Sequence, residues 1–141
     1  MRAAVTVTSR RSGGRSRRSD GRCPLFSELP ISPNGKGVTA PGGAGLLSCR
    51  DDILSTVPVG TGDDDECGDG SHDTMAGTSM ATPHVAGVAG LLFGQGRDFD
   101  EVESAILTTA RQPLTGIQGV FSPVYGWGIV DASAAVSTPR G

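Results

Sequence analysis

The sequence lacks long hydrophobic runs. Nowhere among its 141 residues do about 18 apolar residues follow one another, as a transmembrane helix requires. The first residues, MRAAVTVTSRRSGG, also lack the apolar stretch of about 7–15 residues that defines a secretory signal peptide. We therefore expect no membrane span and no signal peptide in this chain.

Cysteine and histidine are also scarce, with three cysteines and two histidines in the chain. No Cys-x-x-Cys pair and no cluster of histidines and cysteines is present, which argues against a zinc site. Three cysteines leave at least one unpaired. In an exported chain, a disulfide between Cys49 and Cys67 would cross the loop between them.

Aromatic residues make up only 4% of the chain, whereas glycine accounts for 22 residues. This composition favours tight loops and close backbone packing over a large aromatic core. Residues 1–22 contain seven arginines and one acidic residue, but no aromatic residue lies among the arginines for base stacking. A nucleic-acid-binding arm is therefore not favoured, and we interpret residues 1–22 as a poorly ordered segment.

The rest of the chain is acidic, and the stretch TGDDDECGDGSHD offers carboxylates to a hard cation such as calcium. It does not follow the EF-hand pattern, because counted from Asp63 the fifth position is Cys67 and the twelfth is Thr74. A solvated acidic loop is favoured, so we expect no cofactor and keep calcium as the alternative. The carboxylates belong to Asp63, Asp64, Asp65, Glu66, Asp69 and Asp73.

Alternating and β-branched stretches predict strands at residues 3–8, near 37–40 and at about 52–58, the last of them buried. From Ser79 on, the stretch SMATPHVAGVAGLLF is apolar or small on every side, which predicts a helix that is buried all round. Ser79 suits the N-cap of this helix, and Pro83 is tolerable because it falls near the first turn. Small residues, among them Ala86, Gly87, Ala89 and Gly90, would let neighbouring elements approach closely.

A second helix is expected over about residues 100–111. An apolar stripe with the spacing i, i+3, i+4, i+7 and i+8 predicts the face that packs on a core. Either Asp98 or Asp100 has the spacing of a capping box, because a glutamate follows each of them three residues later. Arg111 suits the C-terminal end, and a final helical turn is expected near 132–136. Strands that alternate with helices favour an α/β fold. The stripe consists of Val102, Ala105, Ile106, Thr109 and Ala110.

The stretch GTSMATPHVAG places Ser79 where a loop becomes a helix. The first amides of a helix have free N–H groups and lie at the positive end of the helix dipole. A backbone N–H at this position can stabilise the oxyanion of a tetrahedral intermediate. Gly77 and Thr78 leave room for a substrate carbonyl, so Ser79 is a candidate nucleophile. The alternative is a serine that only caps the helix.

The same stretch resembles the motif around the nucleophilic serine of the subtilisin-like serine proteases, the subtilases. Other segments resemble this family too: FSELPISPNGK, VTAPGG followed by ILSTVP, and YGWGIVDASAAV, which looks like the end of the peptidase domain. The resemblance covers about residues 23–136. It implies an α/β fold, here the C-terminal portion of a three-layer structure with a parallel sheet and a central helix headed by Ser79.

The resemblance also implies roles for single residues. Ser79 corresponds to the nucleophile and its backbone N–H to an oxyanion donor, while Gly77 and Thr78 belong to the same substrate-binding motif. Pro83 and His84 would be structural, with His84 buried. The implied reaction is peptide-bond hydrolysis through an acyl-enzyme, with protein or peptide substrates and an extracellular location.

The partners that would activate this serine are not found in the sequence. No Asp-Ser-Gly or Asp-Thr-Gly segment and no HGTHVAG-like segment occurs, so the family's aspartate and histidine motifs are absent. His84 follows Ser79 by five residues, which on a helix turns its side chain roughly 140° away. His72 is not favoured as a replacement base. Asn34, the single asparagine, suits a turn rather than an oxyanion hole.

We therefore divide the chain into the Arg-rich segment 1–22, a partial subtilisin-like peptidase domain at 23–137 and a tail at 138–141. The predicted function is that of a serine endopeptidase fragment, incomplete as this chain, with the missing N-terminal half of the protease as a partner. The alternative is a non-catalytic remnant or binding protein that retains the fold segment. A partial parallel sheet would leave apolar surface uncovered, so we expect the isolated chain to be marginally stable.

Overall fold

The computed structural model describes residues 36–43, 49–63 and 66–140, together with the backbone of residues 2–6. The turn predicted at Asn34 and most of the predicted Arg-rich segment lie outside these residues. The strands are β1 (Arg2–Thr6), β2 (Gly37–Pro41), β3 (Ile53–Thr56) and β4 (His72–Met75). A 3-10 turn, η1 (Cys49–Asp51), precedes β3, and the helices are α1 (Thr78–Gly94), α2 (Phe99–Thr109) and α3 (Ala132–Ser137).

Strand β2 confirms the strand predicted near residues 37–40, and it pairs antiparallel with β1. The parallel pairing expected for the sheet is limited, in the described residues, to a bridge between Thr39 and Ile129. There the Thr39 N–H donates to the Gly128 carbonyl (2.7 Å), and the Val130 N–H donates to the Thr39 carbonyl (2.9 Å). Parallel neighbours need long crossover connections, and the connection to Ile129 runs through α1 and α2.

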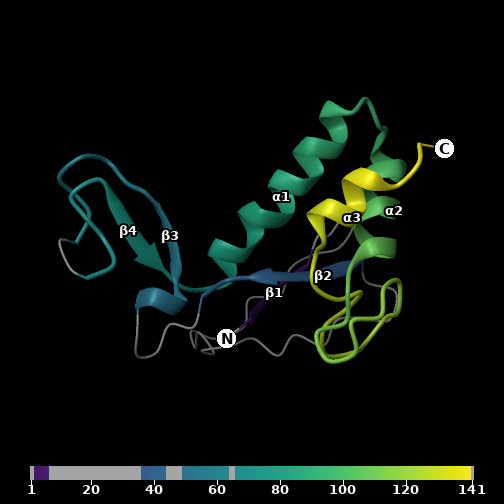
Figure 1. Cartoon of the computed structure of the whole chain (residues 1–141), viewed down its shortest axis with the longest axis horizontal. Coiled ribbons are helices and arrows are strands. Elements are labelled where there is room, and N and C mark those ends of the chain that lie inside the picture. The colour runs from purple at the N-terminus through teal and green to yellow at the C-terminus, as the bar shows by residue number, and fades with distance from the viewer. Residues whose placement is uncertain (1, 7–35, 44–48, 64–65, 141) are drawn as a thin grey trace, which may run out of the picture.

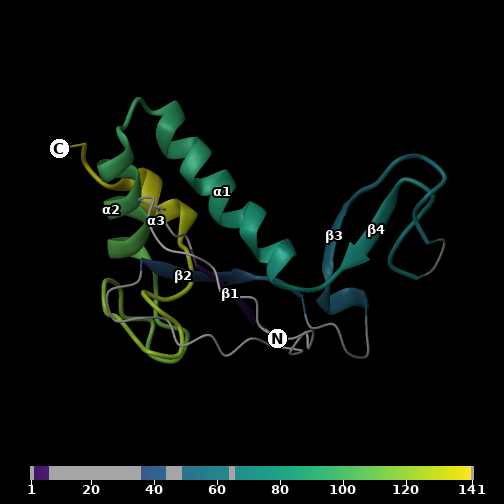
Figure 2. The same ribbon diagram turned by 180° about the vertical axis from the view of Figure 1, so that it is seen from behind.

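Strands β3 and β4 form a separate antiparallel hairpin, in which Ile53 lies opposite Met75. Figures 1 and 2 both show this hairpin at the opposite end of the molecule from α2 and α3. The strand predicted at 52–58 is present but is not buried, and Leu54 is 56% exposed. Strand β4 begins with His72 and Asp73, the last residues of the stretch interpreted as an acidic loop. The sequence there has no alternating hydrophobic pattern to predict a strand. The pairing with β3 satisfies the backbone instead.

Helix α1 packs one face against β1, β2, α2 and α3 (Figure 1). Its outer face is open, with Leu91 59% and Phe93 48% exposed. The prediction of a helix buried all round is therefore wrong, because no element in the described part of the chain covers this outer face. The buried residues form a single stripe of Ala81, Val85, Val88 and Leu92.

Helix α2 places the whole predicted stripe, from Val102 to Ala110, in the core. The helix ends at Thr109 rather than at Arg111, because the backbone is extended at Ala110 and Arg111 forms a bridge with Ile129. Helix α3 confirms the final helical turn. Its N-cap is Asp131, whose carboxylate also pairs with Arg111 at 2.9 Å.

One hydrophobic core joins β2 to the three helices and includes Val38, Leu92, Ile106 and Ala135. None of the helices in the described ranges is long and apolar enough to cross a membrane. The chain enters α1 directly from β4, so the N-terminus of α1, with Ser79, lies between the core and the hairpin (Figure 1).

Candidate active site

Ser79 is the second residue of α1, and its side chain is exposed. The N-cap is Gly77, whose carbonyl accepts the N–H groups of Met80 (3.1 Å) and Ala81 (3.3 Å). The prediction that Ser79 caps the helix is therefore wrong. The helix starts at Thr78, because the preceding glycine adopts a backbone conformation (φ 147°, ψ 174°) that other residues rarely reach. The Ser79 hydroxyl is not consumed by capping.

The first amides of α1 have no partner within the helix. In the part of the chain that the structure describes, no acceptor binds the N–H groups of Thr78 or Ser79. Thr78 is exposed, and its carbonyl accepts the Thr82 hydroxyl at 3.0 Å. Free amides at the positive end of the helix dipole suit an oxyanion that forms beside the Ser79 hydroxyl.

The loop after β2 contacts this end of the helix through glycines. The Gly77 N–H donates to the Gly42 carbonyl at 2.6 Å. A Cβ added to Gly43, which has φ 81°, would lie 2.8 Å from the Cβ of Ala76, so a larger residue does not fit there. These contacts of the APGG segment therefore fix the path by which the chain enters α1.

His84 is exposed on α1, so the prediction of a buried histidine is wrong. It lies outside the buried stripe of α1, and its Nδ1 is 2.9 Å from the Met80 carbonyl oxygen, one turn earlier. This contact agrees with the expectation that His84 does not serve Ser79. Pro83 is also exposed and is the sixth residue of α1, where its missing N–H leaves the Ser79 carbonyl without the usual donor.

His72 belongs to a tight turn at the start of β4. Its Nδ1 lies 3.1 Å from the Ser71 hydroxyl and 3.1 Å from Asp69 Oδ1. The hydroxyl and the amide of Ser71 both donate to Asp69 Oδ1, and together with His72 they hold the pKa of this carboxyl well below its usual range. No base for Ser79 is therefore found among the hydrogen bonds of the described residues. The sequence offered no pattern for this turn.

One group of possible metal ligands comes together in the described residues: Cys49, Glu66 and Cys67. The two cysteines form the disulfide that the sequence suggested, with their Cα atoms 5.9 Å apart. A sulfur in a disulfide is not available as a thiolate ligand. Asp64 and Asp65 of the acidic loop lie outside the described residues.

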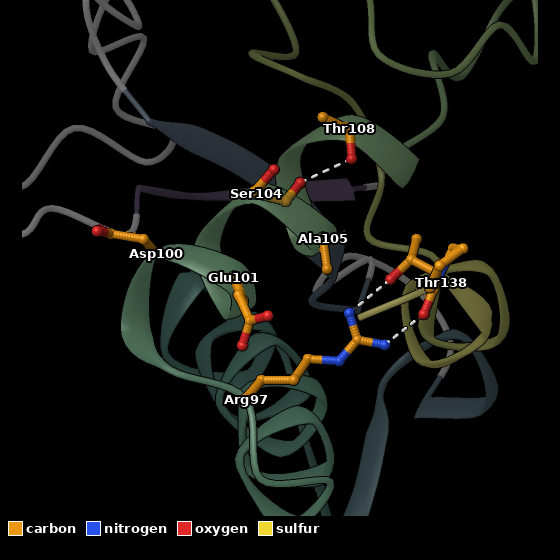
Figure 3. A pocket seen from close by; sticks show the side chains of 8 residues that line it. Arg97, Asp100, Glu101, Ser104, Ala105, Thr108 and Thr138 are labelled. Atoms are coloured by element: carbon orange, nitrogen blue, oxygen red, sulfur yellow. Dashed lines mark hydrogen bonds between the residues drawn. The ribbon is translucent and has the colours of Figure 1, made fainter. Parts of the chain in front are cut away.

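A pocket of about 400 Å³ lies between α2 and the segment after α3 (Figure 3). Arg97 lines it and is only 6% exposed. Its guanidinium donates to the Thr138 hydroxyl (2.7 Å), to the Thr138 carbonyl (2.6 Å) and to the Gln95 side-chain oxygen (2.9 Å). Arg97 thus holds the chain after α3 in place. Its burial could not be predicted from the sequence, because arginine is usually exposed.

A sequence model described as the Subtilase family matches residues 4–128. The chain is 48% identical over 58 residues to thermitase of Thermoactinomyces vulgaris. This match covers 41% of this chain and 17% of thermitase. It is also 37% identical over 71 residues to an extracellular serine protease of Serratia marcescens. That match covers 49% of this chain and 6% of the relative. The chain thus spans less than a fifth of the length of these relatives.

Among solved structures, the chain is similar to a lanthipeptide protease with a TM-score of 0.56 and 24% sequence identity. The match covers 68% of this chain and 33% of the other. At this identity the similarity concerns the fold alone, and it confirms the α/β class predicted from the sequence.

Proposed function

Because the chain belongs to the subtilase family, we propose that it carries the nucleophile of a serine endopeptidase. Ser79 would attack the carbonyl carbon of a peptide bond in a protein substrate and form an acyl-enzyme. The observation that carries this proposal is the exposed Ser79 side chain beside free amides at the N-terminus of α1.

The helix end supplies the electrostatic part of this chemistry. The oxyanion of the tetrahedral intermediate would accept a hydrogen bond from the Ser79 N–H, with support from the helix dipole. Gly77 has no side chain to obstruct the approaching carbonyl. The proton of the Ser79 hydroxyl still needs an acceptor, and His72 and His84 are both engaged elsewhere.

We therefore propose that a further segment of the protease supplies the base and covers the outer face of α1. Two observations support this partner. Leu91 and Phe93 leave apolar surface open on α1. At Gly87 and Gly90, an added Cβ would meet nothing within 4 Å, so another element can approach the helix closely.

We also propose that the protein acts outside the cell. The relative from Serratia marcescens is named as extracellular. The Cys49–Cys67 disulfide supports the same location, because disulfides persist in oxidising compartments.

A chimera tests the peptidase proposal, with residues 37–136 of this chain in place of the matching segment of thermitase. We expect a fluorophosphonate probe to label the chimera at Ser79, and Ser79→Ala to abolish the labelling. Ser133→Ala, at an exposed serine of α3, is the matched control and should label normally. The isolated chain should label at least about 10³-fold more slowly, because a nucleophile without its base loses orders of magnitude in rate.

A chimera that folds, as judged by circular dichroism, but takes up no probe at Ser79 would contradict the proposal. That result would favour a non-catalytic protein that retains this segment of the fold.

A further inference from the structure

The hairpin lobe, defined as residues 49–63 and 66–77, is built differently from the helical part of the molecule. None of its described residues is buried, and Leu54, Val59 and Met75 are 56%, 90% and 48% exposed. The buried core lies instead in β2, in the helices and in the chain between them. Burial of apolar surface, the main stabilising term in folding, therefore contributes little to the lobe.

Backbone hydrogen bonds link the two strands of the lobe, but they do not make it stable by themselves. Strands β3 and β4 pair over four residues each. Beyond the strands, the Val57 N–H donates to the Ser71 carbonyl (2.9 Å), and the Gly60 N–H donates to the Gly70 carbonyl (2.5 Å). A two-stranded hairpin without a hydrophobic face is at best marginally stable in water, so the lobe needs a further restraint.

The disulfide supplies this restraint. It joins Cys49, just before β3, to Cys67, before β4, across a sequence separation of 18. Such a link stabilises mainly by limiting the freedom of the unfolded loop. Both cysteines are half-buried, so a reductant can reach the bond.

The lobe leads directly into the serine segment. Strand β4 ends at Met75, and only Ala76 and Gly77 separate it from α1. Ala76 lies against Gly43, and the Gly77 N–H bonds to Gly42. The order of the lobe therefore bears on how the chain enters the N-terminus of α1.

We propose that the Cys49–Cys67 disulfide is a redox switch that keeps the hairpin lobe folded when oxidised and releases it when reduced, while the helices stay folded. A dithiol reductant opens the bond by attack of one thiolate on a protein sulfur, which releases the thiolate of the other cysteine. The second thiolate of the reductant then displaces the first cysteine and closes its own disulfide, so that proton uptake leaves two protein thiols.

The consequence for Ser79 rests on the proposed function. The hairpin lobe that leads into Ser79 would be folded only where Cys49 and Cys67 are oxidised, and oxidising compartments lie outside the cell.

Hydrogen exchange of the full chain, followed by mass spectrometry with and without dithiothreitol, tests the switch. We expect exchange in peptides from residues 53–57 and 70–75 to accelerate roughly 100-fold on reduction, the scale expected for a disulfide that closes a loop of this length. Peptides from α1 and α2 should keep their rates. The double variant Cys49→Ser with Cys67→Ser should match the reduced protein in air, and Cys23→Ser should match the oxidised one.

Unchanged exchange in the lobe would overturn the proposal, because the lobe would then stand without its disulfide. Equal acceleration in α1 and α2 would overturn it too, because the disulfide would then stabilise the whole molecule. The readout needs no activity, and Ser79→Ala should exchange like the wild type. Failure of the peptidase proposal and failure of the switch are therefore separate results.

Discussion

Two hydroxyl groups of this protein lie in opposite surroundings. The Ser79 hydroxyl is exposed at the N-terminus of α1. Thr39, in β2, is only 2% exposed, and its Oγ1 has no hydrogen-bond partner in the described chain. A buried hydroxyl without a partner gives up its bonds to water and gains none in return, which costs stability.

Thr39→Val should therefore stabilise the protein by about 1 kcal/mol, because valine keeps the shape of threonine and removes the unpaired hydroxyl. The free energy of unfolding in urea measures the effect. Thr109→Val is the matched control, since the buried Thr109 hydroxyl donates to the Ala105 carbonyl at 2.7 Å, and its loss should bring no gain. A lower unfolding midpoint for Thr39→Val would contradict the prediction.

The start of α2 shows how a local sequence signal becomes one definite cap. Asp98 and Asp100 both have the spacing of a capping box, and the structure uses Asp98. Its carboxylate accepts the Glu101 N–H at 2.9 Å, and the Glu101 carboxylate accepts the Asp98 N–H at 2.9 Å. Asp100 lies in the first turn and is exposed.

Asp98→Ala should lower the free energy of unfolding by about 1 kcal/mol, because the Glu101 N–H at the helix start loses its acceptor. Asp100→Ala is the matched control and should cost only about 0.3 kcal/mol, through the helix dipole. Urea titration of both variants checks the difference. Equal losses would show that the cap is not formed by Asp98.

The two faces of α1 differ in burial, and this difference bears on the stability of the whole molecule. The inner face holds Leu92, which is fully buried, while Leu91 beside it is 59% exposed. The helical part thus has a core on one side of α1 and open apolar surface on the other. This asymmetry supports the expectation of marginal stability for the isolated chain.

Leu92→Ala should cost about 2–5 kcal/mol, because it leaves a cavity in the core. Leu91→Ala should change the free energy of unfolding by less than about 0.5 kcal/mol, as is usual for exposed positions. Urea unfolding of the isolated chain gives both values. Similar losses for the two variants would mean that the outer face of α1 is covered in solution.

The candidate site was only partly predictable from the sequence. The segment around Ser79 could be found, because a helix start and its small flanking residues are neighbours in the chain. The roles of its neighbours could not. Gly77 replaced Ser79 as the cap, and His84 is exposed rather than buried, since both depend on backbone angles and on packing partners far along the chain.

Features that depend on neighbouring residues could be inferred from the chain alone: the α2 stripe that begins at Val102, the cap spacing before it, and the position of Ser79 at a helix start. Features that depend on contacts between distant segments became known only from the folded molecule. These are the pairing of β4 with β3, the burial of Arg97, and the exposure of one face of α1. Hydrophobic periodicity indicates which side chains can be buried, but their burial requires another element that covers them.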